Sequence, residues 1–598
     1  MSEVIRRAAP RAADRPISSD AASLLLRALP AAGVLVFYWA LIERSAFTYA
    51  GRRLYPLFDD AMISMRYARN LAEGHGLTWN PGEAPVEGFT NPLWTLWMAA
   101  LHLAGFSEAT AGLALALSAA LLVIATAFVV RAVAARLYPD DGLAAAVGFW
   151  GTLTYYPLVF WSLRGMEVGL VALLLALGVL LCLRLHEGFS ANALVALGAV
   201  LSLGLLTRME FALPAVVIAA FAVQGQRERG WAIAATLGVT IVATLAALTA
   251  WRLAYYGELL PNTYYLKVAG IPLDVRLARG VPALLFNVFQ HLGPLVILPA
   301  IYALRQRARL TRGEVLILTL FAAACGYSAW VGGDAWEDYA FANRYVAPVV
   351  PLVLLLTVRA IGSLGESRGR ALVWAAAVFL MFALLNTMGG EAPRATPLWA
   401  RTAGSFGMAI VLLFAATHRP GPQLRTWIVL AAALGALNLA PVFGWLERGA
   451  PHSDGDAAMS AYGLLLRQTT APDATIAVTW AGAVSYYSRR TSFDELGKTD
   501  DVVAHRPNVA TSFRPGHSKW DLNYTIGELR PDVITGLFVA GADDLAQIEA
   551  WGYVQLTGSC YYLAGSENVD APALRAGLAT LMANPRFSEY LCPPAIAP

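Results

Sequence analysis

The sequence predicts a polytopic α-helical membrane protein that ends in a soluble domain, and three observations point to this fold class. Of its 598 residues, 57% are hydrophobic and only 14% are charged, whereas a soluble protein usually carries about 25% charged residues. Apolar stretches such as 111–130, 230–253 and 427–442 have about the length that a helix needs to cross a bilayer. From about residue 451 onward such stretches end, and Asp, Asn, Gly and Pro are spaced through the chain.

The arginines predict the orientation, because short loops rich in Lys and Arg stay on the cytoplasmic side of the membrane. Basic residues gather in the N-terminal tail and near 227–229, 305–312, 359–370 and 419–425. The other connections are then extracytoplasmic, namely 46–91, 257–285, 332–344, 389–401 and everything after about 446. We expect about 11–13 transmembrane helices, and either odd count puts the N-terminus inside and the C-terminus outside the plasma membrane.

We expect two domains, a transmembrane domain over 1–446 and an extracytoplasmic soluble domain over 447–598. In the second domain, short β-like runs alternate with helical or turn-like pieces, which predicts a mixed α/β or β-rich fold. These runs are Thr475–Trp480, Asp532–Thr535 and Tyr553–Leu556. A lipid bilayer surrounds the first domain in this prediction, and no nucleic acid is an expected partner.

The first extracytoplasmic loop, 46–91, places two adjacent carboxylates, Asp59 and Asp60, at the start of an expected helix. Apolar residues recur at helical spacing over 60–71, so we expect an amphipathic helix along the membrane surface, with Arg66 and Arg69 as candidates for contacts with lipid headgroups. One Asp at a helix start often only caps it, but a cap needs one carboxylate and this loop has two. Such a pair could remove a proton from a hydroxyl group or attack an electrophilic carbon.

Charged residues near the membrane form a second group of candidates. Arg208 lies between two short apolar stretches with Glu210 nearby, and charges at that depth are costly unless they are paired or line a site. Arg208 therefore either binds an anionic group with its planar fork or forms an ion pair with Glu210 that holds two bent helices. Lys267 and Arg344, in outer loops, are candidates for the same anion, and the alternative for each is an interfacial side chain that snorkels.

A divalent cation, Mg or Mn, is the one cofactor that the residues suggest. Asp334 and Glu337 lie three residues apart in an outer loop, and hard cations prefer oxygen ligands. Two acids at this spacing are equally common in an exposed loop without a metal.

The four cysteines divide by location. Cys560 and Cys592 lie in the predicted outer domain, where disulfides persist, and we expect a bridge between them, the alternative being two free thiols. Cys182 and Cys325 lie in apolar stretches and are expected to pack as small hydrophobic side chains.

Sequence blocks along nearly the whole chain resemble the membrane glycosyltransferases of the GT-C fold. The blocks are Asp59–Trp97, Arg164–Glu167, Thr207–Phe211, Gly332–Glu337, Tyr486–Arg489, Asp494–Lys498 and Pro515–Asp521. The stretch Val86–Trp94 together with Gly332–Glu337 is most similar to the mycobacterial terminal arabinofuranosyltransferases.

The resemblance implies transfer of arabinofuranose from decaprenylphosphoryl-arabinofuranose to the ends of cell-wall arabinan, in arabinogalactan and lipoarabinomannan, with terminal β-1,2 linkages. It implies that Asp59 and Asp60 are the catalytic pair, with Asp59 favoured for the chemistry and Asp60 also capping the helix. Arg208, Arg344 and Lys267 would bind the donor phosphate. The residues expected to contact substrate are Glu87, Asn91, Glu167, Glu210, Asp334, Trp336 and Glu337.

Three alternatives stay open at this point. Another polyprenyl-phosphate sugar, such as mannose, could be the donor, because the sequence does not display the shape of the pocket. A flippase or channel for lipid-linked sugars would also have many spans, but it would not need an acidic pair or a large outer domain. A non-catalytic scaffold for wall glycans is the third class. In the outer domain, Tyr486, Tyr487 and Trp520 either grip a glycan or form a core.

Overall fold

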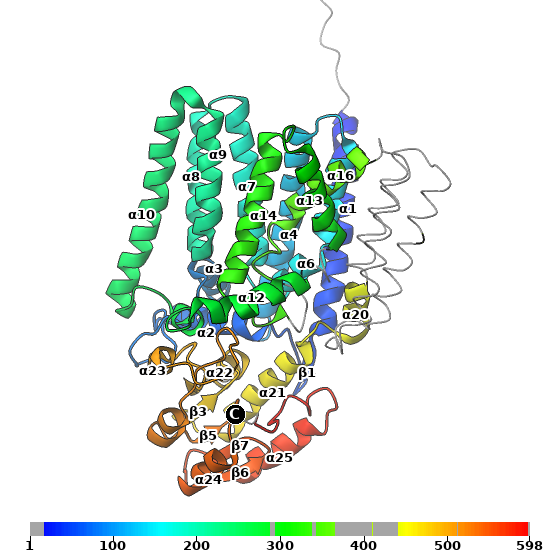
Figure 1. Ribbon diagram of the computed structural model, residues 1–598. Coiled ribbons are helices and arrows are strands. Elements are labelled where there is room, and N and C mark those ends of the chain that lie inside the picture. Colours follow the sequence, from blue (N-terminus) through cyan, green and yellow to red (C-terminus); the bar gives the residue numbers. More distant parts are fainter. Residues whose placement is uncertain are drawn as a thin grey trace, which may run out of the picture.

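The computed structural model describes residues 17–287, 293–337, 343–364, 410, 440–510 and 512–595. Long helices run side by side in one bundle, and the C-terminal domain packs against one end of it (Figure 1). The helices up to the bundle's last described segment are α1 (Ile17–Ser45), α2 (Asp59–Ala72), α3 (Pro92–Leu103), α4 (Ala111–Leu137), α5 (Gly142–Thr154), α6 (Tyr156–Leu163), α7 (Val168–Glu187), α8 (Ala191–Thr207), η1 (Met209–Phe211), α9 (Ala212–Gly225), η2 (Arg227–Arg229), α10 (Gly230–Tyr256), α11 (Asn262–Lys267), α12 (Leu273–Asn287), α13 (Gly293–Gln306), α14 (Arg312–Trp330), α16 (Val350–Leu364) and α20 (Ala440–Arg448).

Four of the described helices, α4, α7, α10 and α14, are long and apolar enough to cross a membrane, and α5 with α6 makes a fifth if this pair, bent by 43°, is one span. The expected spans 111–130 and 230–253 lie within α4 and α10. Shorter apolar helices include α8 and the run Met209–Gly225. The expected total of 11–13 spans and most of the expected span 427–442 involve residues outside the described ones.

The C-terminal domain is built on a five-stranded sheet with the order β4-β3-β5-β7-β6. Strand β3 pairs in parallel with β4 and β5, whereas β7 pairs in antiparallel with β5 and β6. Of the two alternatives for this domain, the mixed α/β fold is therefore the observed one. Its elements are α21 (Ser453–Thr469), β3 (Thr475–Val478), α22 (Ala483–Ser488), β4 (Thr491–Asp494), α23 (Asp501–His505), η6 (Asn523–Glu528), β5 (Val533–Ile534), α24 (Ala542–Ala550), β6 (Tyr553–Thr557), β7 (Cys560–Leu563) and α25 (Ala571–Met582).

Both faces of this sheet are buried, as the alternation along the interior strand β3 shows. In β3, Ile476 and Val478 belong to the large core that continues into the helical bundle, whereas Ala477 belongs to a separate small core with Ile526 and Ile548. Successive side chains of a strand point to opposite faces, so one face joins the sheet to the bundle and the other packs on η6 and α24. The domain is thus fastened to the membrane helices by continuous apolar packing.

Helix α2 is where the structure corrects the sequence-based expectation. The helix forms over Asp59–Ala72, but most of its residues are buried. The C-terminal domain, which we call the outer domain from here on, covers the face that was expected to meet lipid headgroups. Arg66 donates hydrogen bonds to the carbonyl oxygens of Ser485 and Arg490 at 2.8 and 2.9 Å, and Arg69 donates to the carbonyl of Tyr486 at 2.5 Å. The helical spacing of apolar residues in a sequence predicts that a helix has a polar face. It does not predict whether water, lipid or protein backbone covers that face.

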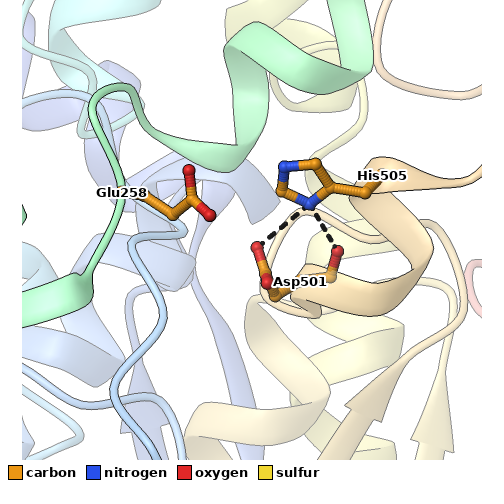
Figure 2. A group of neighbouring side chains, drawn as sticks. All are labelled: Glu258, Asp501 and His505. Atoms are coloured by element: carbon orange, nitrogen blue, oxygen red, sulfur yellow. Dashed lines mark hydrogen bonds and ion pairs between the residues drawn. The ribbon is translucent and has the colours of Figure 1, made fainter.

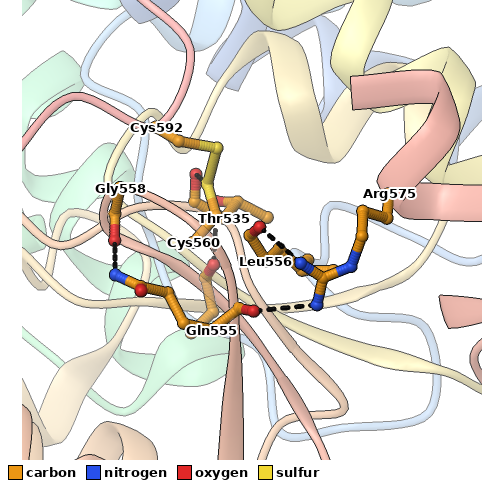
Figure 3. The surroundings of a disulfide bond; sticks show 8 residues. Thr535, Gln555, Leu556, Gly558, Cys560, Arg575 and Cys592 are labelled. Atoms are coloured by element: carbon orange, nitrogen blue, oxygen red, sulfur yellow. Dashed lines mark hydrogen bonds between the residues drawn. A yellow bond between two sulfur atoms is a disulfide. The ribbon is translucent and has the colours of Figure 1, made fainter. Parts of the chain in front are cut away.

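A disulfide joins Cys560 of β7 to Cys592, with their Cα atoms 5.3 Å apart (Figure 3). It ties the segment after α25 back to the sheet. Arg575 of α25 strengthens the same junction, because its guanidinium donates to the carbonyl oxygens of Leu556 and Gln555 at 3.0 and 2.9 Å. The pairing expected from the sequence is the one that the structure contains.

Candidate active site

A cavity of about 320 Å³ lies where the helical bundle meets the outer domain. Its walls come from the start of α2, the break between α8 and α9, the segment around α11, the end of α14 and two loops of the outer domain. The charged and titratable side chains that line it are Asp60, Arg208, Glu210, Lys267, Arg344, Lys498 and His517. Four basic side chains face two carboxylates, so the cavity favours an anionic ligand.

The start of α2 is held in place by the short turn after α6. The backbone N–H of Phe58, the residue before the helix, donates to the carbonyl of Arg164 at 2.9 Å. The guanidinium of Arg164 in turn donates to the carbonyl of Pro56 at 2.9 Å and pairs with the buried Asp456 of α21. Both domains therefore fix the position from which the two acids project.

Asp60 points into the cavity. One of its carboxylate oxygens accepts a hydrogen bond from Nη1 of Arg344 at 3.0 Å, and the other lies 3.6 Å from Nζ of Lys498. Burial raises the pKa of Asp60, but Lys498, Arg344 and Lys267 together outweigh it and hold the pKa below its usual range. Asp60 is therefore a carboxylate at neutral pH, within reach of a ligand in the cavity.

Asp59 points the other way. Its carboxylate accepts hydrogen bonds from the backbone N–H groups of Ala483 and Gly482 at 2.7 and 3.2 Å, and a Cβ atom on Gly482 would lie 1.9 Å from the carbonyl oxygen of Asp59. Burial raises the pKa of Asp59 to about 6, although Lys498 and the two N–H groups oppose the shift. Neither acid caps the helix, whose N-cap is Phe58. Of the two acids, Asp60 therefore lines the cavity, whereas Asp59 is bound to the backbone of the outer domain.

Arg344 links Asp60 to a second acid. Its Nε lies 3.1 Å from the fully buried carboxylate of Asp334, so Asp334 fixes the guanidinium from behind and does not itself line the cavity. Glu337 is placed in the same way, because it accepts from Asn343 at 2.8 Å and lies 3.7 Å from Arg279. Both acids that suggested a metal are thus engaged with protein donors.

Among the described residues, one other group of side chains has the geometry to hold a metal ion, namely Glu258, Asp501 and His505 (Figure 2), whose ligand atoms lie within 4.8 Å of one another. His505 already contacts Asp501 at 3.2 Å, and Glu258 accepts from the hydroxyl of Tyr265 at 2.7 Å. The group joins the loop after α10 to α23 and does not line the cavity.

Arg208 lies at the break between α8 and η1, where its backbone is extended. Its guanidinium contacts Glu167 at 2.8 Å and Glu210 at 2.6 Å, and it also donates to Thr90 at 3.0 Å. Asn91 donates to the remaining oxygen of Glu167 at 2.7 Å. Of the two alternatives for Arg208, the ion-pair network is therefore present, while the side chain still borders the cavity.

Of the other residues expected to contact substrate, some line the cavity and others do not. Asn91, Glu210 and Trp336 line the cavity. Glu87 does not, because it is buried in an ion pair with Arg252 of α10 at 2.7 Å. Trp336 stands edge-on to Phe58, with ring centroids 5.1 Å apart.

Two residues of the outer domain were not among the expected site residues. Lys498 follows β4 and His517 lies in the loop before η6, and both line the cavity. His517 is buried, which lowers its pKa well below the usual value and keeps the ring neutral. A signal for Lys498 was present in the composition, because the chain has only three lysines, Lys267, Lys498 and Lys519, and two of them meet at this cavity.

An apolar groove of about 80 Å³ opens beside the cavity, between α7, α9 and α14. Leu175, Leu213 and Leu320 are among its lining residues, and it shares Arg208 and Arg344 with the cavity. A hydrocarbon chain in the groove would thus end at a cluster of cations next to Asp60. This arrangement suits an amphiphile with an anionic head.

Comparisons with known proteins bear on the fold. Residues 452–571 match a family described as a domain of unknown function, DUF8728, and no curated protein matches the chain. Among solved structures, ArnT from Cupriavidus metallidurans bound to undecaprenyl phosphate is similar with a TM-score of 0.55 at 14% identity, over 90% of this chain and 98% of that one.

Two further structures show weaker similarity. Apo ArnT from the same organism gives a TM-score of 0.48 at 15% identity, over 82% of this chain and 90% of that one. The apo oligosaccharyltransferase of Archaeoglobus fulgidus gives 0.43 at 12% identity, over 84% and 69%. The likeness to ArnT over nearly the full length of both chains confirms the predicted fold class: the chain adopts the membrane-embedded GT-C fold with a mixed α/β domain at its C-terminus.

Proposed function

We propose that this protein is a glycosyltransferase that takes its sugar from a polyprenyl-phosphate donor. One observation carries the proposal: the carboxylate of Asp60 lies in a basic cavity that continues into an apolar groove. The similar ArnT structure holds undecaprenyl phosphate, a lipid with the same combination of a long apolar tail and an anionic head. A donor of this class would place its tail in the groove and its phosphate among Arg344, Lys267 and Lys498.

Lys267 is the cation best placed to accept a new anion. Within the described part of the chain, no carboxylate lies within ion-pair distance of its ammonium, whose nearest polar contact is the hydroxyl of Tyr345 at 3.4 Å. Arg344 and Lys498 contact Asp60 and also line the cavity. Arg208, by contrast, is already neutralised by Glu167 and Glu210, so we assign it to the edge of the phosphate site.

Asp60 is the group that we propose for the chemistry. Lys498 and Arg344 lower the pKa of Asp60, which makes it a weak base. A phosphate that binds these two cations offsets their charge and makes Asp60 more basic. The carboxylate can then take the proton of the acceptor hydroxyl while the lipid phosphate leaves, or attack the anomeric carbon itself.

For the sugar, we propose arabinofuranose carried by decaprenyl phosphate, and for the acceptor, the ends of cell-wall arabinan in arabinogalactan and lipoarabinomannan. The support is the sequence resemblance to the mycobacterial terminal arabinofuranosyltransferase AftB, above all over Val86–Trp94 and Gly332–Glu337. A β-1,2 product from a β-linked donor retains configuration. Transfer would therefore use either front-face departure of the phosphate with Asp60 as the base or a covalent intermediate on Asp60, because a single back-side displacement inverts the anomeric carbon.

We further propose that the cavity and the domain over 447–598 face the extracytoplasmic side of the plasma membrane. The arginine-rich connections between α9 and α10 and between α13 and α14 lie at the end of the bundle opposite the outer domain (Figure 1). Because arginine-rich loops remain in the cytoplasm, this polarity supports an outside location for the site.

The test is a transfer assay with purified protein in detergent, synthetic decaprenylphosphoryl-arabinofuranose and a short arabinan acceptor, followed by mass and linkage analysis. A β-1,2 arabinosyl product that is lost in Asp60→Asn but kept in Asp543→Asn, an exposed acid of α24, is the expected result. Transfer from decaprenylphosphoryl-mannose alone would overturn the sugar assignment and keep the enzyme class. If folded protein transfers from neither donor, the proposal of a glycosyltransferase using these donors is wrong.

A further inference from the structure

We propose that the outer domain carries a second glycan site, which binds the acceptor polysaccharide behind its reacting end. This inference rests on the proposed function. The site is a surface pocket of about 350 Å³ between the end of α23, the loop before η6, and α24, a volume within the range of roughly 300–1,000 Å³ that is usual for small-molecule sites. We call it the outer pocket, and its main lining residues are Arg506, Trp520, Asp521, Asn523, Gln547 and Trp551.

Two partly exposed indole rings give the outer pocket flat apolar surfaces. Trp551 packs against Gly527 of η6, where an added Cβ atom would lie 2.9 Å from the ring. This contact holds the indole in place while its other side lines the pocket. Aromatic faces of this kind suit the apolar C–H faces of sugar rings, because the ring face is electron-rich.

The polar side chains of the outer pocket have unused hydrogen-bonding capacity. Within the described residues, no hydrogen bond engages the indole N–H of Trp520 or Trp551, or the side-chain amides of Asn523 and Gln547. An indole offers one donor, and each amide offers donors and an acceptor. These groups match the hydroxyl groups of a sugar, which both donate and accept.

The charged side chains that line the outer pocket are two acids and one cation, Asp521, Asp544 and Arg506. Arg506 pairs with Asp521 at 2.9 Å, and Asp544 accepts from the backbone N–H of Gly541 at 2.8 Å at the start of α24. Among the described lining residues, the one cation is thus already paired and acids are in excess. This excess disfavours a lipid phosphate or another anion and favours an uncharged, polyhydroxylated ligand.

The outer pocket and the active-site cavity are neighbours along the chain. His517 lines the cavity and Trp520 lines the outer pocket, so their Cα atoms are at most roughly 11 Å apart in a fully extended chain. Between them, the carbonyl of Ser518 accepts from the backbone N–H of Val509 at 3.1 Å, which fixes this short wall. In this inference, one polysaccharide chain occupies both sites, with its end at Asp60 and its inner residues at Trp520.

The first test measures how KM depends on acceptor length, with arabinofuranosyl di-, tetra- and octasaccharides. In the wild type, KM should fall as the acceptor lengthens. Trp520→Ala should raise KM for the octasaccharide about tenfold, the equivalent of about 1.4 kcal/mol, and leave kcat and the disaccharide KM unchanged. Trp231→Ala, an 83% exposed tryptophan on α10, is the matched control, and Asn523→Ala with Gln547→Ala repeats the test without altering an aromatic ring.

The second test does not need activity. Tryptophan fluorescence of Asp60→Asn should change saturably with the octasaccharide, and the change should disappear when Trp520→Ala is added. The inference of an outer pocket is wrong if the wild type transfers sugar with a KM that does not depend on acceptor length. It is also wrong if Trp520→Ala has the same KM for the octasaccharide as the wild type. In both cases the proposed function is retained. If no donor supports transfer yet the octasaccharide binds at Trp520, the proposed function is wrong and the outer pocket stands.

Discussion

Helix α2 separates two regions that hold buried cations in different ways. Toward the outer domain, Arg66 uses every donor: it bonds to the carbonyls of Trp79, Ser485 and Arg490 and to two side-chain oxygens, and it lies 4.3 Å over the ring of Trp79. In the cavity, the contacts of Lys267 and Lys498 with other described side chains are fewer: Lys267 lies 3.4 Å from the hydroxyl of Tyr345 and Lys498 lies 3.6 Å from Asp60. A buried cation with saturated donors holds structure together, whereas one with spare donors is available to a ligand.

The largest effect should come from Asp60, the acid of the cavity region. Asp60→Asn should reduce the rate of sugar transfer by about 10²–10⁴-fold, which is the usual contribution of a general base. The substitution should not lower the unfolding temperature. The rate is measured by product formation under saturating donor, with Asp543→Asn as the control. A near-wild-type rate would remove Asp60 from the chemistry and return Asp59 to consideration.

The next effect concerns the structural region. Arg66→Met should lower the free energy of unfolding by about 3 kcal/mol or more, because each buried acceptor left without a donor costs about 1–3 kcal/mol. Thermal unfolding and limited proteolysis at the junction with the outer domain would measure this. Arg53→Met is the control, since Arg53 forms a largely exposed pair with Glu43 that should contribute about 0–1 kcal/mol. Equal losses in both variants would contradict the assigned role of Arg66.

The next prediction concerns Lys498, the lysine that the outer domain contributes to the cavity wall. Lys498→Met should raise the donor KM about tenfold, since a charge-assisted contact to phosphate is lost. Because Lys498 lowers the pKa of Asp60, its removal should also move the acid limb of the pH profile of kcat/KM to higher pH. Lys519→Met is the matched control, because Lys519 donates to the carbonyl of Ala504 and does not line the cavity. An unchanged acid limb would show that Lys498 does not act on Asp60.

The smallest expected effect is a change in folding stability with pH that is caused by the titration of Asp59. Burial raises its pKa from 3.8 to about 6 in the folded protein, so between these values the folded state binds more protons than the unfolded state. The stabilisation is complete below about pH 4 and is lost as the pH rises to about 6. The unfolding temperature of the wild type relative to Asp59→Asn should therefore fall by a few degrees over this interval, and a constant difference would contradict the assignment.

Sequence patterns were sufficient to predict those features that depend on residues close together in the chain. The start of α2 at the two acids, the break at Arg208 and three of the outer strands follow from short-range periodicity and composition. The covering of α2 by the outer domain could not be predicted, because Arg66 meets partners more than 400 residues away. The same holds for the pair between Arg208 and Glu167 and for Lys498 beside Asp60, since a single sequence does not say which distant segments pack together.

The separation in sequence between α2 and its partners also determines the order in which the walls of the cavity form. Arg66 and Ser485 are 419 residues apart, and Lys498 and His517 are among the last residues to join the cavity. Domains generally fold from the N-terminus onward during synthesis, so the helical bundle forms while the acidic pair still lacks its outer wall. The cavity is completed only when the C-terminal domain has folded against the helical bundle, so a prematurely terminated chain would bear both acids but no finished site.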